Sequence, residues 1–429
     1  MLKRNGNKYL YLIAILAFTL GGTLNRTFFT FSFLSPSECT IVILFVVLLS
    51  KGLVLNRPYV FHVTWVDKIY FFYILCAIII PIFVNSADLN IDIDFFKFML
   101  PIKIWIVYRI FYCLLFENYL EGKLKEKIDL IFNFVLFIAV IASLIGILRL
   151  LSLPVITDLI NHIWMATTRP RLWSTMGGIN TGALFFAICA IISIFQFIKH
   201  NKKIYLFYFS LFIFSVILTG SFSATITLIF ALIIFFKKYF NVKRLIITLS
   251  FLTICFGVIL TIEPIKNSVD HVIKRRIRQQ FPQSDTAYKW IPSHLVKRYR
   301  RWVILYDYLL EKPILGYGLK GVPEVDPNTR VYTHNYYVFL MAYSGILGLS
   351  AYLFMIYVVL KKLNKLKQFK RERFLVKVII FMYLLTQISQ LSFQYGGLSE
   401  LFGVLLALTA IMVKFEIRTD RNGLEQKVS

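Results

Sequence analysis

The chain has 429 residues, of which 58% are hydrophobic and only 16% charged, and its formal net charge is +26. This balance excludes an ordinary soluble globular protein. The apolar runs are continuous, whereas the strands of a β-barrel would alternate, so the sequence predicts an all-α, polytopic membrane protein. We expect one integral membrane domain over residues 1–429.

Apolar runs of about 17 to 22 residues predict about twelve transmembrane helices. In chain order they lie at 9–23, 33–50, 69–85, 95–116, 129–151, 180–198, 204–220, 222–241, 245–262, 335–360, 374–391 and 398–414. The first run has the charge pattern of a signal peptide, but no small-residue cleavage pattern follows it, which favours a retained span. Gly220 and Ser221 are expected to form the tight turn after 204–220.

Alternate short connections are rich in Lys and Arg, for example "EGKLKEK", "KHNKK" and "KKLNKLKQFKRER", whereas "NSADLNIDID" between them is acidic. Cation-rich loops remain in the cytoplasm, so both termini are predicted to be cytoplasmic and the protein to lie in the plasma (inner) membrane. Topology thus explains most of the net charge, and nucleic acid is not an expected partner.

Two outer segments break this pattern: 152–179, which contains "TTRPRLWSTMGGIN", and the large periplasmic or extracellular loop 263–334. Long loops escape the charge rule, so their cations can serve function. The cluster in "HVIKRRIRQQF" is typical of an amphipathic helix at the lipid surface. In "KRYRRW", Arg298 and Arg301 share a helical face, and Trp302, Leu305 and Leu309 form an apolar stripe. Guanidinium groups so placed favour a phosphate-type anion.

His334 lies in "YTHNYY", where the loop enters the span 335–360. A neutral imidazole there could accept a proton from a hydroxyl nucleophile, and the simpler alternative is a histidine that bonds a loop carbonyl. The sequence has no nucleotide-binding loop and no metal-ligand spacing, and its five cysteines all lie in apolar runs. We therefore expect neither a metal nor a cofactor.

These residues carry a resemblance. The stretch "RYRRWVILYDYLLEKPILGYG" followed by "HNYYVFLMAYSG" resembles the O-antigen polymerase and ligase superfamily. The matching positions are Arg298, Trp302, Pro313, Gly316, Gly318, His334, Asn335 and Gly345. The earlier "RPRLWSTMGGIN" is similar to a second family segment, with Arg171 and Asn180 at the matching positions.

The resemblance implies a membrane-embedded glycosyltransferase of GT-C-like architecture that inverts configuration without a metal. Its donor would be an undecaprenyl-diphosphate-linked oligosaccharide at the outer face of the inner membrane. Arg298 and His334 would be catalytic, and Arg169, Arg171, Arg301, Trp302 and Asn335 would bind the diphosphate or the glycan. Membrane lipid, a chain-length regulator and a flippase are the partners implied.

The reaction type remains open between two family activities. A polymerase joins lipid-linked repeat units of O-antigen or capsule, and a ligase transfers the finished chain to lipid A-core in lipopolysaccharide biosynthesis. Ser223 stands where similar ligases often carry an arginine, which favours the polymerase. A flippase for lipid-linked sugars is a third interpretation, but the sequence shows no internal repeat of the kind that builds such transporters.

Overall fold

The computed structural model describes residues 42–50, 61–84, 95–120, 122–150, 172, 179–239, 263, 302–303, 305–306, 308–318, 335–389 and 398–428. These residues are almost entirely helical, and no strand occurs among them. The prediction of an all-α chain is confirmed for this part of the sequence.

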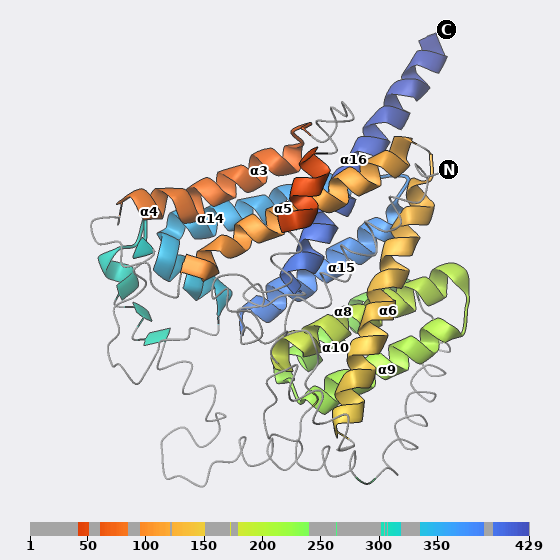
Figure 1. Cartoon of the computed structure of the whole chain (residues 1–429), viewed down its shortest axis with the longest axis horizontal. Helices are drawn as coiled ribbons and strands as arrows, with labels where there is room; N and C mark the ends of the chain where they lie inside the picture. Colours follow the sequence, from red (N-terminus) through yellow and green to blue (C-terminus); the bar gives the residue numbers. More distant parts are fainter. Residues whose placement is uncertain are drawn as a thin grey trace.

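The principal helices form a bundle (Figure 1). After a helix at 42–50, their bounds are α3 Trp65–Ile74, the π-helix η3 Leu75–Ile79, α4 Ile80–Val84, α5 Phe95–Leu120, α6 Leu124–Leu150, α8 Ile179–His200, α9 Ile204–Thr219, α10 Phe222–Tyr239, α14 Tyr336–Asn364, α15 Lys370–Gln387 and α16 Leu398–Val428. The widened turn of η3 precedes Pro81, which has no N–H to donate to the Ala77 carbonyl.

Two of the helices, α8 and α16, are largely buried by their neighbours. In α8, every residue from Thr181 to Gln196 is buried, and α6, α9 and α10 pack around it. The helix α16 lies along α5, and α15 contacts α8, α10 and α14. A hydrogen bond between the Thr227 and Thr386 hydroxyls joins α10 to α15 at an oxygen separation of 3.1 Å.

Charged side chains within the bundle are paired. Lys103 of α5 lies 2.6 Å from Glu400 of α16, and both side chains are largely buried. Lys199 of α8 binds Asp129 at 2.7 Å and Glu372 at 2.8 Å, which ties α6, α8 and α15 together. Such pairing is expected of ionisable groups that are largely removed from water, because an isolated buried charge is costly.

The cation-rich ends of the helices meet at one end of the bundle, around the connection from α14 to α15. Lys125 and Lys238 lie over the rings of Phe369 and Phe374. Glu416 of α16 accepts hydrogen bonds from the backbone nitrogens of residues 367 and 368. The described segments among those predicted to share the cytoplasmic side therefore lie together, and their location in the cytoplasm stays a prediction.

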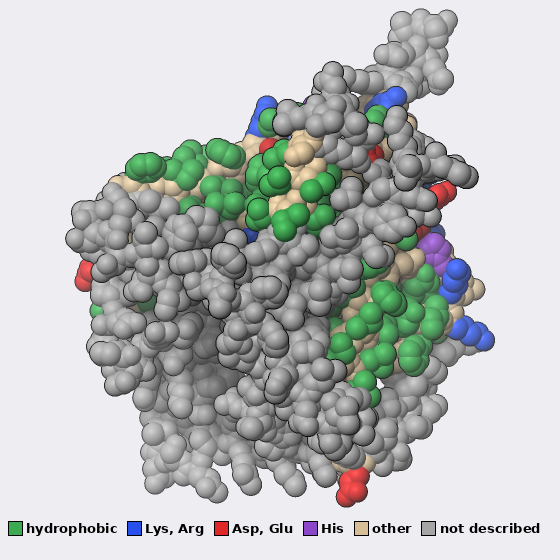
Figure 2. Space-filling model, in the orientation of Figure 1, with side chains coloured by type: hydrophobic (Ala, Val, Ile, Leu, Met, Phe, Trp, Pro, Cys, Tyr) green, Lys and Arg blue, Asp and Glu red, His purple; other side chains and the backbone are tan. Residues whose placement is uncertain are grey.

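The described residues include five helices long and apolar enough to cross a membrane, namely Leu124–Leu148, Ile179–His200, Phe222–Tyr239, Tyr336–Asn364 and Leu398–Thr419. On three of them, α6, α10 and α14, large apolar side chains are exposed, and Figure 2 shows exposed hydrophobic patches with basic side chains along the edge of one patch. A multi-pass membrane protein is supported, while the count of twelve spans remains a prediction. The expected turn is present, with Gly220 in the left-handed conformation at φ 61°.

One expected span differs in the structure. The sequence predicts a continuous helix over 335–360, whereas α14 is interrupted at Gly345, whose φ of 60° and ψ of −163° are not helical. The apolar pattern runs through this position unbroken, so hydropathy alone gives no sign of the interruption.

Candidate functional site

The interruption of α14 is held by the motif turn that contains Pro313, Gly316 and Gly318. The Tyr317 amide donates a hydrogen bond to the Ala342 carbonyl, at the end of the first half of α14. The amides of Ile346 and Leu347 donate to the Pro313 and Ile314 carbonyls, at the start of the second half. The turn therefore satisfies backbone groups that both new helix ends would otherwise leave unpaired.

Two motif glycines allow this contact. A Cβ atom on Gly345 would lie 2.2 Å from the Ile314 carbonyl oxygen, and one on Gly316 would lie 2.7 Å from the Gly345 nitrogen. Both residues also have positive φ values, 64° at Gly316 and 60° at Gly345. Only glycine meets both requirements without strain. Motif positions that are 29 residues apart in the sequence are thus one structural unit.

The first half of α14 folds back toward the second. In a continuous α-helix, the Cα atoms of residues 336 and 352 would be about 24 Å apart. The Tyr336 and Tyr352 rings are instead 5.5 Å apart, and the Tyr336 and Tyr73 hydroxyls are 3.0 Å apart. The beginning of α14 therefore lies inside the bundle, at the level of Tyr352, about 10 Å along the second half from Gly345.

Asn335 is the N-cap of this re-entrant half-helix, defined here as residues 336–344. Its side-chain oxygen accepts hydrogen bonds from the amides of Tyr337 at 2.9 Å and Val338 at 3.2 Å. Asn335 is 7% exposed. Asparagine is a preferred N-cap because its short side chain reaches these amides. Asn335, an asparagine of the family motif, therefore has a structural role, which is to start this half-helix inside the bundle.

The helix before the motif turn has the apolar stripe that the sequence predicts. Residues 302–303, 305–306 and 308–311 are helical, Leu305 is buried, and Trp302 is half-buried. Tyr317 is buried in the turn, and its hydroxyl donates to Glu311 at 2.5 Å. Burial and this carboxylate raise the pKa of Tyr317 to about 12. Glu311 thus joins the end of this helix to the motif turn.

The earlier motif segment is anchored through Leu172, the neighbour of Arg171. Leu172 is completely buried, and its amide donates to the Leu218 carbonyl near the end of α9. Its side chain fills the space over Gly146 of α6, where a Cβ would lie 2.8 Å away. Asn180 is exposed near the start of α8.

The anchor at Leu172 and the turn at Gly345 lie at the same end of the bundle, opposite the cation-rich end. The helix α9 begins at Ile204, directly after Lys202 and Lys203, and ends near Leu172. The second half of α14 likewise runs from Gly345 to Lys361 and Lys362. Leu172 and the motif turn therefore lie on one side of the bundle.

Several predicted site residues lie outside the described residues, namely Arg169, Arg171, Arg298, Arg301 and His334. Their roles stay predictions. Asn335 and Trp302 are described. Asn335 directly precedes the re-entrant half-helix, and Trp302 lies in the helix before the motif turn. The described residues Leu172, Trp302 and Asn335 are the neighbours in sequence of Arg171, Arg301 and His334.

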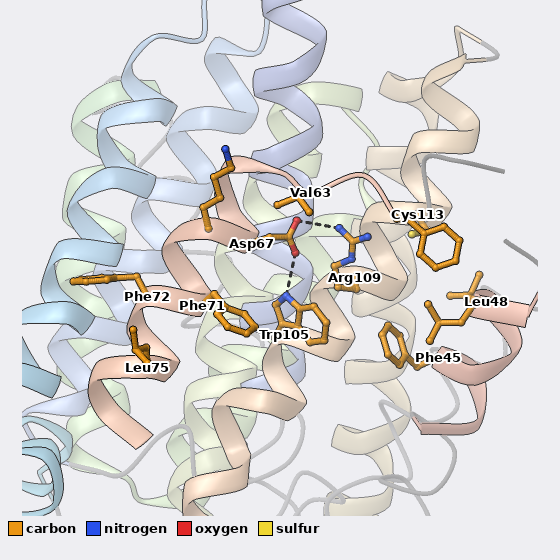
Figure 3. A pocket seen from close by; sticks show the side chains of 13 residues that line it. Phe45, Leu48, Val63, Asp67, Phe71, Phe72, Leu75, Trp105, Arg109 and Cys113 are labelled. Atoms are coloured by element: carbon orange, nitrogen blue, oxygen red, sulfur yellow. Dashed lines mark hydrogen bonds and ion pairs between the residues drawn. The ribbon is translucent and has the colours of Figure 1, made fainter. Parts of the chain in front are cut away.

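A second polar cluster, which the sequence did not predict, surrounds Asp67 (Figure 3). Asp67 of α3 accepts hydrogen bonds from Arg109 at 2.9 Å and from the Trp105 indole at 3.0 Å. Thr64 caps α3 and donates to the same carboxylate at 2.8 Å. The group lies at the polar end of an otherwise apolar pocket of about 650 Å³ between α3, α5 and the helix at 42–50. The sequence feature that could have indicated this cluster is Arg109, an arginine within an apolar run.

The described residues contain no group of three or more His, Cys, Asp or Glu side chains that could hold a metal ion. Cys76, Cys113 and Cys189 are buried and unpaired with one another. Burial places these thiols among apolar side chains, where they pack as small hydrophobic groups.

Comparison with protein families gives one match. Residues 207–353 match the family described as O-antigen ligase, which confirms the resemblance to the O-antigen polymerase and ligase superfamily. The matched range begins in α9 and ends in the second half of α14, so it includes the motif turn and the re-entrant half-helix. A search of curated proteins found no match. The family match supports a membrane enzyme of the O-antigen ligase and polymerase type.

Proposed function

We propose that the protein is a polymerase of surface polysaccharide, acting on O-antigen or capsule repeat units linked to undecaprenyl diphosphate. It joins the units by metal-independent, inverting glycosyl transfer at the outer face of the inner membrane. The observation that carries the proposal is the fold-back of α14. The motif turn holds the break at Gly345, the re-entrant half-helix begins at Asn335 inside the bundle, and both lie within the O-antigen ligase match.

In the proposed reaction, a hydroxyl of one lipid-linked glycan attacks the anomeric carbon of another. The new bond forms between the acceptor oxygen and that carbon, the bond from the carbon to the diphosphate breaks, and undecaprenyl diphosphate leaves. His334 takes the hydroxyl proton, and Arg298 stabilises the charge that grows on the departing diphosphate. Arg169, Arg171 and Arg301 hold the diphosphate, and Asn335 and Trp302 contact the glycan.

The geometry around Asn335 supports this arrangement. The N-terminal end of a helix has a partial positive charge, and the start of the re-entrant half-helix lies inside the bundle. Within a low-dielectric interior, fixed donors interact more strongly with a developing negative charge than they would in water. The side-chain oxygen of Asn335 caps the helix, so Asn335 contacts the glycan through its side-chain NH2 group.

A ligase is the second candidate, because the matched family is described as O-antigen ligase. Both reactions use the same donor and the same leaving group, and they differ only in the acceptor hydroxyl. Ser223, where similar ligases often carry an arginine, favours the polymerase. A flippase would use the same lipid-linked glycan without making a bond, and it is a less favoured alternative.

The experiment uses purified protein in detergent, where no membrane separates two compartments and a flippase can form no product. The lipid-linked repeat unit is supplied with or without lipid A-core, and the products are resolved on a gel. A ladder from the repeat unit alone identifies a polymerase. Product that requires lipid A-core identifies a ligase, and unchanged substrate in both reactions contradicts a glycosyltransferase.

A further inference from the structure

We propose that Tyr73 of α3 is a positioning residue for the glycosyl-transfer site, acting through Tyr336 on the His334 and Asn335 segment. The inference rests on the proposed function and deepens it. Tyr73 lies 134 residues before the family match begins, and no motif of the sequence includes it.

The contact joins two buried side chains from distant parts of the chain. Tyr73 is 2% exposed and Tyr336 is 4% exposed, and their hydroxyl oxygens lie 3.0 Å apart. Tyr336 is the first residue of α14, directly after the cap residue Asn335. A hydroxyl in an apolar interior is costly to leave without a partner, so this bond fixes where the half-helix begins.

A second tyrosine holds the same point from the other side. The Tyr337 hydroxyl donates to the Leu384 carbonyl of α15 at 2.8 Å. The start of the half-helix is therefore clamped between α3 and α15 by two consecutive tyrosines. Since the cap residue Asn335 directly precedes the clamp, the position of Tyr336 sets the position of Asn335.

Ring packing reinforces this clamp. The Tyr73 ring lies 5.8 Å from Tyr352, and the Tyr352 ring lies 5.5 Å from Tyr336 in an edge-to-face arrangement. Tyr352 in turn donates from its hydroxyl to Gln387 at 2.7 Å. Replacing tyrosine by phenylalanine at residue 73 keeps this ring packing and removes only the bond to Tyr336.

The neighbouring turn of α3 and η3 explains why Tyr73 meets Tyr336. A Cβ on Gly348 would lie 3.2 Å from the Ala77 Cα, so η3 and the second half of α14 approach closely. Tyr73 precedes Ala77 by one turn, just as Tyr352 follows Gly348 by one turn on α14. The returning half-helix brings Tyr336 to this same level, where Tyr73 is available as its partner.

The test compares Tyr73→Phe, Tyr336→Phe and the double variant in the polymer assay with purified protein. Tyr205→Phe is the matched control, because Tyr205 is also buried and its hydroxyl donates to Asn133 of α6 at 2.9 Å, at the cation-rich end of the bundle. Folded protein is equalised by size-exclusion chromatography before kcat and KM for the lipid-linked donor are measured.

We expect Tyr73→Phe and Tyr336→Phe each to lower kcat about three- to tenfold with little change in KM. The double variant should be no slower than the slower single variant, because both changes remove the same bond. Tyr205→Phe should lower thermal stability yet keep the kcat of the folded enzyme. This split separates positioning from general loss of packing.

Two outcomes would overturn the inference while the wild type still makes product. One is a kcat of Tyr73→Phe equal to that of Tyr205→Phe, and the other is a double variant whose loss is the product of the two single losses. If the wild type makes no product with or without lipid A-core, the proposed function itself fails, so the two failures are distinguishable.

Discussion

Gly316 and Gly345 pack backbone against backbone, with only 2.7 Å between a Cβ built on Gly316 and the Gly345 nitrogen. This contact allows the motif turn to bond both halves of α14. The two glycines are therefore required by geometry, in a region where the sequence alone predicts an uninterrupted span.

The first prediction concerns this contact. We expect Gly345→Ala to lower the free energy of unfolding by about 2 to 4 kcal/mol, because a methyl group would collide with the Ile314 carbonyl at a strained φ. Gly122→Ala is the matched control, since Gly122 has a φ of 72° and no atom within 4 Å of its Cβ position. Thermal unfolding in detergent measures both variants. Equal losses at the two glycines would show that backbone strain alone, without the collision, explains the effect.

The second prediction concerns the ion pair between Asp67 and Arg109. Both side chains are about nine-tenths buried, so Arg109→Gln should leave an uncompensated carboxylate and cost about 3 kcal/mol of stability. Adding Asp67→Asn should restore part of the loss. Lys68→Gln changes an exposed neighbouring charge and should have almost no effect. A double variant less stable than Arg109→Gln would contradict the account of this cluster.

The third prediction concerns sidedness. Thr286→Cys, in the loop 263–334, should react with a membrane-impermeant maleimide in intact spheroplasts. Lys202→Cys, an exposed residue at the cation-rich end of the bundle, should react only after the membrane is opened. The reverse labelling pattern would show that the topology is inverted.

The fourth prediction concerns metal dependence. Arginine side chains stabilise the leaving diphosphate in the proposed mechanism, so a chelator in the assay should leave the rate of polymer formation unchanged. The assay is run with the purified protein before and after dialysis against chelator. A loss of activity that added Mg²⁺ or Mn²⁺ restores would show that a metal takes part in the reaction.

Much of the fold follows from hydropathy. Continuous apolar runs predicted α5, α6, α8, α9, α10 and α15 to within about five residues of their observed bounds, and Gly220 marked the turn between α9 and α10. The start of α16 was also predicted, but the helix continues 14 residues beyond the predicted end, to Val428. These features are local, since each depends on residues within a few helical turns. The cation pattern likewise predicted which helix ends lie together.

The break in α14 and the contact of Tyr73 with Tyr336 could not be predicted in this way. Both depend on residues far apart in the chain, and apolar periodicity does not change at Gly345. The family resemblance marked Gly316 and Gly345 without a physical reason for either. The structure supplies that reason in their contact.

The central claim is tested most directly by polymer formation from the lipid-linked repeat unit, comparing the wild type with Arg298→Ala and His334→Ala. His294→Ala serves as the control histidine in the same loop. We predict a ladder from the wild type and from His294→Ala, and a rate at least two decades lower from Arg298→Ala and His334→Ala at equal folded protein. Ladders of wild-type rate from both of the latter variants would contradict the account.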